Sequence, residues 1–203
     1  MSVQTRSDID RSQDPAAAGV LNGFEVATLG GLVETLEEHP EGGRATLFIR
    51  TRWRDGDVRV VSRMSGYEID GERVHETERE HVVRTDELRE VGSTDTAASP
   101  GELFLSAVGS CITATTRAYA ATRGIRLSSL EVAVDGDVKL QGMFGLDADV
   151  RPGLRELRVT MRIAGDADDE ALRELALLGY QFSPVRETVH NGAPVTPDVV
   201  VSA

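Results

Sequence analysis

The sequence predicts an α+β fold, in which strands occur in runs and helices are inserted between the runs. Two observations support this class. Short alternating stretches typical of strands fill residues 44–84 and 125–165, and the stretch from Pro100 to Gly124 carries apolar residues at helical spacing. Strict alternation of strand and helix is missing, so a doubly wound parallel sheet is not expected. A chain of 203 residues is long enough to bury a core of its own.

Composition divides the chain into three parts. We expect residues 1–20 to be a disordered polar tail, residues 21–43 to form an N-terminal helical appendage, and residues 44–203 to form the main domain. In the appendage, Asn22 is a candidate N-cap, and the helix should end near Pro40. The main domain should open with a hairpin that turns at Asp55-Gly56, followed by charged edge strands and a polar connection.

The second half of the chain alternates between clear helix and strand signals. The long central helix should begin at Ser99-Pro100 and stop at Gly124. Two strands follow, and then a helix capped by Asp166 or Asp168. A short helix capped by Ser183 and a final turn and strand complete the expected order.

Charge and composition argue against several classes of function. The formal net charge of -12 opposes binding to nucleic acid or to an anionic membrane surface. No apolar run approaches the ~18 residues of a membrane span. The N-terminal residues lack the charged-then-apolar order of a signal peptide, so we expect a cytoplasmic protein. No phosphate-binding glycine loop is visible, and no cofactor is predicted.

The sequence predicts no metal site. A single cysteine cannot supply an intrachain disulfide or a cysteine-rich zinc centre. The four histidines are scattered. His75 and His81 fit one strand face with Glu76 or Glu80 nearby, but charged strands are more typical of solvated sheet faces.

Cys111, the only cysteine, admits two interpretations. On spacing alone it is a small apolar residue of the helix face, because free cysteine is among the most buried residue types. The other interpretation is a nucleophile, which requires a lowered thiol pKa. Cys111 lies about three turns into its helix, where the effect of the helix terminus has faded. A reactive thiolate would therefore need a cation from elsewhere in the fold.

Two segments resemble the family of osmotically inducible and organic-hydroperoxide-resistance proteins, OsmC/Ohr. "SPGELFLSAVGSC" ends at Cys111, and "FSPVRETVHNGAPV" begins at Phe182. The similarity extends from about Arg44 to the C-terminus, so residues 44–203 are expected to be an OsmC-like domain. "RWRDG" from Arg52 and "GMFGLDADVRPG" from Gly142 are similar to a subgroup that carries an N-terminal helix.

The resemblance implies an intertwined homodimer, with two central helices wrapped by antiparallel sheets and each active site at the subunit interface. It implies that Cys111 is the peroxidatic thiol. Arg54 matches the arginine that stabilises the thiolate, with Arg52 as its competitor. Glu102 is the candidate that orients the arginine, although the family places its glutamate one residue earlier, where this chain has Gly101.

Ser183 stands where the family has its resolving cysteine. The expected activity is therefore one-cysteine reduction of a hydroperoxide, with an external thiol regenerating Cys111. The expected substrate pocket consists of Phe104, Trp53, Phe144 and Ser183. Two alternatives remain open: a non-catalytic ligand-binding or stress-associated protein, and a different chemistry at the same thiol.

Overall fold

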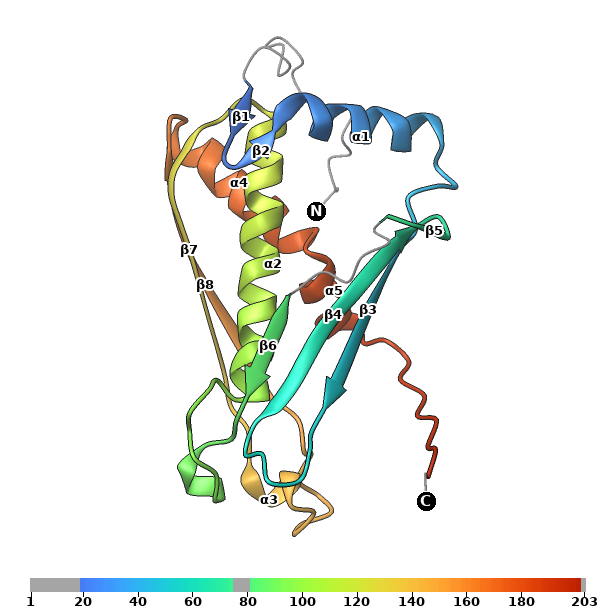
Figure 1. The fold of residues 1–203 in the computed structure, drawn as a ribbon. Coiled ribbons are helices and arrows are strands. Elements are labelled where there is room, and N and C mark those ends of the chain that lie inside the picture. The colour runs from blue at the N-terminus through green and yellow to red at the C-terminus, as the bar shows by residue number, and fades with distance from the viewer. Residues whose placement is uncertain (1–18, 75–80, 202–203) are drawn as a thin grey trace. The chain divides into compact units, whose positions relative to one another are not determined.

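The computed structural model describes residues 19–74 and 81–201 (Figure 1). The chain forms two compact units. Residues 28–106 make up one, here the hairpin unit; residues up to Ala27 and from Ala107 onward make up the other, here the C-terminal unit. Most of the expected tail, residues 1–20, and His75 lie outside the described residues. Both units combine helices with antiparallel strands, which confirms the predicted α+β class.

The hairpin unit is built on two long antiparallel strands, β3 (Ala45–Arg52) and β4 (Val60–Ile69). The short strands β5 (Glu72–Arg73) and β6 (Val82–Thr85) both pair with β4. The predicted hairpin and the charged edge strands are thus confirmed, and the polar connection that follows holds a single short 3₁₀ turn, Arg89–Val91. A register shift between Phe48 and Ile49 bends the long pair.

The N-terminal segment differs from the prediction at its start. A small hairpin, β1 (Val20–Leu21) and β2 (Phe24–Glu25), precedes α1, which begins at Val26 and ends at Glu38. The predicted end near Pro40 is confirmed.

Asn22 is not the helix N-cap, and that prediction was wrong. It lies in the turn of the small hairpin with a φ of 49°. Its side chain donates to the carbonyl of Ile125 at 2.8 Å and accepts from the amide of Leu127 at 2.9 Å. The Asn22 carbonyl accepts from Arg117 Nε at 2.8 Å. Asparagine tolerates left-handed backbone, and these three bonds fasten the turn to the end of the central helix.

The central helix α2 spans Pro100–Thr122, as predicted, and Gly124 follows it with a φ of 69°. Its buried positions form one stripe: Val108, Gly109, Ile112, Thr116, Ala120 and Ala121. Gly109 allows close approach to the sheet, since a Cβ there would lie 3.3 Å from Val134 Cγ2 and 3.4 Å from the Val132 carbonyl. The small residue Gly109 therefore allows the helix backbone to pack closely against the strand that contains Val132 and Val134.

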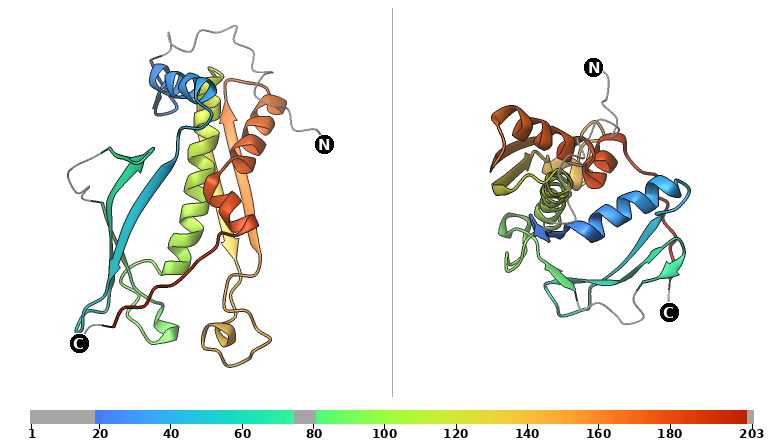
Figure 2. Two further views of the ribbon diagram at one scale, coloured as in Figure 1. Left: turned by 90° about the vertical axis from the view of Figure 1, so that its right-hand side faces the viewer. Right: turned by 90° about the horizontal axis from the view of Figure 1, so that it is seen from above.

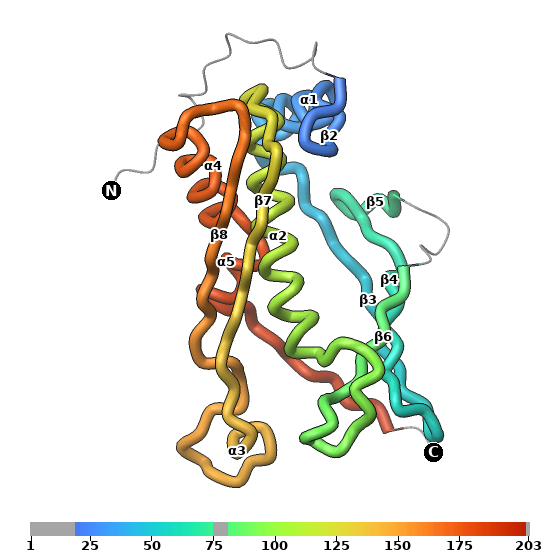
Figure 3. Tube along the Cα trace, turned by 90° about the vertical axis from the view of Figure 1, so that its left-hand side faces the viewer, coloured from blue at the N-terminus to red at the C-terminus, as the bar shows by residue number. Residues whose placement is uncertain are grey.

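The two long strands of the C-terminal unit, β7 (Leu127–Gly136) and β8 (Leu157–Gly165), pair antiparallel as predicted and run alongside α2 (Figure 3). Half-buried and exposed residues alternate along both strands. On the exposed face Arg158 binds Asp135 and Asp137, and Asp137 lies 2.8 Å from the guanidinium. This partner holds the pKa of Asp137 below its usual value. The helix α3 (Leu140–Met143), which was not predicted, lies in the connection between the strands.

Helix α4 (Asp169–Gln181) crosses α2 obliquely, and α5 (Pro184–Asn191) follows it (Figure 1, Figure 2). The predicted caps are confirmed: Asp168 accepts from the amide of Ala171 at 2.8 Å, and Ser183 caps α5. Asp166, the alternative cap, instead accepts from the amide of Arg126 at 2.7 Å.

Gly179 permits the contact between α4 and α2. It packs against Thr116, which is fully buried and donates its hydroxyl to the carbonyl of Ile112 at 2.8 Å. A Cβ added at Gly179 would overlap the Thr116 side chain and lie 2.8 Å from its Cα. Earlier in α4, Leu172 and Leu175 complete the core cluster with Ala120.

The predicted C-terminal strand was wrong. Residues 192–201 form no strand, and Val195, Val199, Val200 and Val201 are all exposed. A strand requires a hydrogen-bonding partner, and none of the described strands pairs with this segment.

We predict that Gly179→Ala lowers the free energy of unfolding by about 1–3 kcal/mol, because the added methyl group forces α4 away from Thr116. Chemical denaturation at equilibrium measures the change. Gly31→Ala in α1 is the matched control. It also replaces a helical glycine but meets no atom within 4 Å, so it should stabilise by roughly 0.5–1 kcal/mol. Equal effects of the two substitutions would contradict the packing argument.

Candidate active site

The thiol of Cys111 lies at the border between the buried stripe of α2 and its accessible side. Cys111 is half-buried, whereas Val108 and Ile112 beside it are buried. Its carbonyl accepts from Thr115 Oγ1 at 2.9 Å, which occupies that hydroxyl within the helix. Cys111 is therefore not fully enclosed in the core, and both interpretations made from the sequence remain compatible with its position.

Ser183 is fully buried at the start of α5, and its hydroxyl accepts from the amide of Arg186 at 3.4 Å. Cys111 and Ser183 belong to the same compact unit. That their side chains lie close together stays a prediction.

The two candidate arginines lie at the tip of the long hairpin. Arg52 ends β3, Arg54 lies in the turn that follows, and both are exposed. They line a hollow of about 740 Å³ in the hairpin unit. Cys111 belongs to the other unit. That one of these guanidiniums stabilises the thiolate stays a prediction.

Glu102 holds the start of α2. Its Oε2 accepts from the amide of Ser99 at 2.7 Å and from the Ser99 hydroxyl at 2.8 Å, and the Ser99 hydroxyl in turn accepts from the Glu102 amide at 3.3 Å. This reciprocal arrangement is a capping box. The two bonds from Ser99 lower the pKa of the Glu102 carboxyl. The Ser-x-x-Glu spacing was the signal in the sequence, and it was missed.

No ion pair joins Glu102 to Arg52 or Arg54 in the part of the chain that the structure describes. The capping box gives Glu102 a structural role that needs no arginine. Its role in orienting the catalytic arginine therefore stays a prediction, supported only by the resemblance.

The aromatic residues expected to line the substrate pocket are accessible. Trp53 is 60% exposed, and its indole nitrogen donates to the Asp57 carbonyl at 2.7 Å. Phe104 is 40% exposed near the start of α2, and Phe144 is 55% exposed just after α3. Trp53 and Phe104 belong to the hairpin unit, Phe144 to the C-terminal unit. That they form one pocket with Ser183 stays a prediction.

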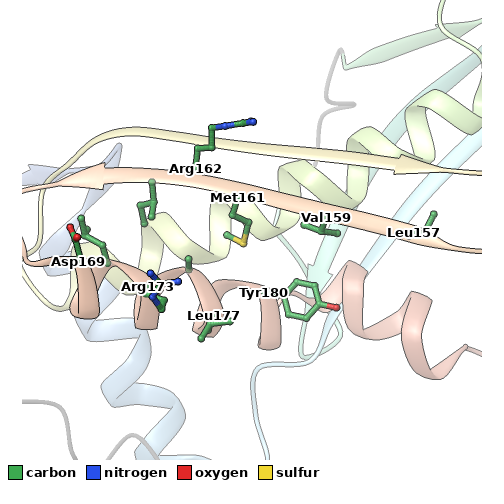
Figure 4. Close-up of a pocket in the computed structure, with 11 residues that line it drawn as sticks. Leu157, Val159, Met161, Arg162, Asp169, Arg173, Leu177 and Tyr180 are labelled. Carbon is green, nitrogen blue, oxygen red and sulfur yellow. The ribbon is translucent and has the colours of Figure 1, made fainter.

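A separate hollow of about 670 Å³ lies between β8 and α4 (Figure 4). Val159, Met161 and Leu177 form its walls, and Asp169 and Arg173 lie at one end. None of the predicted pocket residues lines it. The sequence signal was the pair of apolar faces, at alternate positions of β8 and at helical spacing in α4.

Asp86 organises the connection that leads into α2. It is buried, and its carboxylate accepts from the hydroxyls of Ser93 and Thr94, each at 2.5 Å. The amide and hydroxyl of Thr96 donate to it at 2.8 and 2.9 Å. These bonds hold the pKa of Asp86 far below its usual value. A segment that the sequence indicated only as polar is therefore folded tightly around one carboxylate.

Two kinds of feature are missing from residues 19–74 and 81–201. No group of three or more histidine, cysteine, aspartate or glutamate side chains there is arranged to hold a metal ion. His75, considered with His81, lies outside those residues. No helix among them is both long enough and apolar enough to cross a bilayer.

Comparisons with known proteins show a family and a fold. The model of the OsmC-like protein family matches residues 92–198, which include Cys111 and Ser183. The structure is similar to that of an OsmC like protein from Mycoplasma pneumoniae, with a TM-score of 0.55 and 16% identity over 72% of this chain and 89% of that one. No curated protein sequence matched the chain.

Two further solved structures are similar. A protein from Psychrobacter arcticus 273-4, assigned to the osmotic stress and detoxification response, gives a TM-score of 0.51 and 16% identity over 70% of this chain and 87% of that one. An organic hydroperoxide resistance protein from Elizabethkingia anophelis gives a TM-score of 0.49 and 14% identity over 72% of this chain and 89% of that one. At these identities the structural likeness concerns the fold alone.

We predict that Asp86→Asn lowers the Tm by roughly 5 °C at pH 7, because an amide cannot accept from all the donors that converge on the carboxylate. The lowered pKa means that the charge of Asp86 stabilises the fold fully above the pKa of an unfolded aspartate, about 3.9, and less as the pH falls below it. The difference in Tm should therefore narrow between pH 6 and pH 3 in scanning calorimetry. Asp95→Asn, at an exposed position of the same connection, is the control and should change the Tm little.

Proposed function

Because the chain belongs to the OsmC-like protein family, we propose that it reduces organic hydroperoxides with the thiol of Cys111. The observation that carries the proposal is the half-buried thiol in the middle of α2, at the position of the family's first cysteine. The name of the Psychrobacter arcticus protein, which refers to a detoxification response, supports a role in stress resistance. A partly accessible sulfur suits catalysis better than a fully enclosed one.

The proposed reaction begins with the Cys111 thiolate. Its sulfur attacks the distal oxygen of the hydroperoxide, the O–O bond breaks, and the leaving alkoxide takes up a proton to become an alcohol. Cys111 is oxidised to a sulfenic acid. An external thiol then attacks that sulfur, water leaves, and a mixed disulfide forms. A second external thiol releases Cys111 and carries away the disulfide.

The thiolate needs a positive charge that the helix itself does not supply. Cys111 is too far from the start of α2 for the helix dipole to act on it. A guanidinium near a thiolate favours its charged form, and Arg54 or Arg52 is the proposed source. Both are exposed at the hairpin tip and have no carboxylate partner among the described residues.

Ser183 determines how the sulfenic acid of Cys111 can be reduced back to a thiol. Its hydroxyl caps α5 and cannot form a disulfide, and the chain has no second cysteine. Reduction of the sulfenic acid therefore requires a thiol from outside the chain. We expect oxidation to sulfinic acid at high peroxide as the consequence. Cytoplasm, where low-molecular-weight thiols stay reduced, is the compartment that this cycle requires.

We also propose that the active form is a homodimer, with each site at the subunit interface. The exposed valines of the C-terminal segment support it, because apolar surface of this kind is typical of protein interfaces. The strand β8 pairs only with β7 in the described structure, so its other edge is available to a partner. Light scattering after size exclusion tests the oligomeric state directly.

A second candidate function is supported by one observation. Glu102 is engaged in the capping box, so the partner that would orient the arginine is already occupied. A protein that binds a ligand without turnover would tolerate this loss. Such a protein would carry a slow thiol at Cys111, and its Cys111→Ser variant would protect cells as well as the wild type does.

We predict that stoichiometric cumene hydroperoxide converts Cys111 to a sulfenic acid, which dimedone traps and mass spectrometry detects. Removing the guanidinium that stabilises the thiolate, by Arg54→Gln or Arg52→Gln, should raise the pKa of the Cys111 thiol by about 1–2 units. Alkylation rates as a function of pH measure this change. The rate of oxidation at pH 7 should fall by roughly tenfold or more in the same variant.

Arg89→Gln is the matched control, because Arg89 is an exposed arginine of the same unit and lies outside the hairpin. It should leave both the pKa and the rate unchanged. A Cys111 that stays a free thiol under stoichiometric peroxide would refute the proposal. A thiol pKa that neither hairpin substitution changes would refute the role of the arginines.

We predict that Ser183→Cys restores a resolving thiol. Because residue 183 stands where the family has its resolving cysteine, in the same compact unit as Cys111, peroxide should produce an intrachain disulfide. The variant should resist oxidation to sulfinic acid, at a cost of about 1 kcal/mol in stability for the lost cap. Intact mass before and after reduction identifies the disulfide. Thr188→Cys, on the exposed part of α5, is the control and should not protect Cys111. Equal sulfinic acid in Ser183→Cys and the wild type would contradict the expectation.

A further inference from the structure

Five arginines gather around one hollow on the sheet of the hairpin unit. The hollow has a volume of about 740 Å³, within the usual range for small-molecule sites. Its lining contains a single acidic residue, Asp57, so four positive charges remain uncompensated. The chain as a whole has a net charge of -12. This hollow, here the arginine hollow, therefore opposes the charge of the protein around it; its arginines are Arg50, Arg52, Arg54, Arg59 and Arg63.

The register of the sheet forces two of these arginines together. Arg50 of β3 lies directly opposite Arg63 of β4. Residues directly opposite in an antiparallel pair point to the same face, and like charges there destabilise the pair. Val82 of β6 lies opposite Arg63 on its other side and supplies no counter-charge. Folding thus places two guanidiniums side by side at a cost in stability.

The arginines of the hollow differ from others in the chain. Arg158 binds Asp135 and Asp137, and Arg123 lies 3.4 Å from Glu174. By contrast, none of the five has an ion pair or a side-chain hydrogen bond within residues 19–74 and 81–201. Acidic residues outnumber basic ones by 34 to 22, so free carboxylates are plentiful. The guanidinium groups of the hollow can therefore bind a ligand without first losing a carboxylate partner.

The chemistry of the lining indicates the class of ligand. Guanidinium forks bind phosphate oxygens in a bidentate manner. Four uncompensated charges call for more than one phosphate group, since each monoester carries about -1.5 to -2 at pH 7. Val61, Met64 and Val82 add apolar surface to the lining. We propose that the arginine hollow binds a small oligophosphate. The overall negative charge of the chain opposes a long polyanion such as nucleic acid.

This site goes beyond the proposed peroxide chemistry. Arg52 and Arg54 line the hollow and are also candidates for stabilising the thiolate, whereas Arg50 and Arg63 have no proposed part in that chemistry. Substituting the latter pair therefore tests the hollow by itself. Binding should also persist in Cys111→Ser, which abolishes the proposed reaction, so failure of one proposal can be told from failure of the other.

The experiment titrates the full-length protein with inorganic tripolyphosphate, ATP and citrate at matched ionic strength, by calorimetry and by thermal shift. We expect both phosphate ligands to bind and to raise the Tm, and citrate to bind at least tenfold more weakly. Equal affinity for the two phosphate ligands would mean that the site recognises phosphates alone. Tighter binding of ATP would mean that the apolar lining also contributes. Affinity should fall with added salt.

The decisive variant is Arg50→Gln/Arg63→Gln. It should weaken oligophosphate binding by roughly tenfold or more for each arginine lost, while the Tm of the free protein stays the same or rises because the like-charge pair is gone. Arg89→Gln/Arg155→Gln removes the same charge from exposed arginines that do not line the hollow and should bind as the wild type does. Absence of binding to tripolyphosphate and ATP would overturn the proposal. Equal weakening by both double variants would also overturn it.

Discussion

The contact between Gly179 and Thr116 is the constraint on which the C-terminal unit depends. Because residue 179 has no side chain, α4 approaches the backbone of α2 and buries Thr116 completely. The position of α4 in turn determines where α5 begins, at the cap of Ser183. The same contact therefore constrains both the packing of the core and the position of Ser183.

Two carboxylates build the approach to the central helix. Asp86 accepts hydrogen bonds from hydroxyls of the connection after β6, and Glu102 accepts hydrogen bonds from Ser99 at the start of α2. Both carboxyls have lowered pKa values because their donors prefer the charged form. Perturbed carboxyl groups near a candidate site are often taken as catalytic. Here hydrogen bonds within one short segment account for the perturbation, so it supports a structural role for each.

The sequence predicted elements well wherever the signal was local. The hairpin around Asp55-Gly56, the cap at Asp168, the stop at Gly124 and the Ser183 cap each depend on neighbouring residues, and all are present. Asn22 was misassigned because its actual partners, Ile125 and Leu127, are a hundred residues away. The C-terminal valines satisfy a strand pattern but lack a described partner strand. For the candidate site, the family resemblance predicted Cys111 and Ser183, and their roles stay predictions. The sequence could not predict that one sheet face would collect five arginines, because that depends on the pairing register of β3 with β4.

The distribution of arginines connects the two proposals physically. An arginine bound to carboxylates, such as Arg158, has its charge largely compensated and offers little to a thiolate or a phosphate. A guanidinium that acts on a ligand must lack such a partner, and neighbouring guanidiniums of this kind repel one another. In the sheet of the hairpin unit this repulsion acts between Arg50 and Arg63. In a chain with so many acidic residues, arginines without a carboxylate partner lower the stability of the fold. Their presence therefore indicates a role in binding an anion. A thiolate is one anion and an oligophosphate is several, so the number of free guanidiniums exceeds what peroxide reduction alone requires.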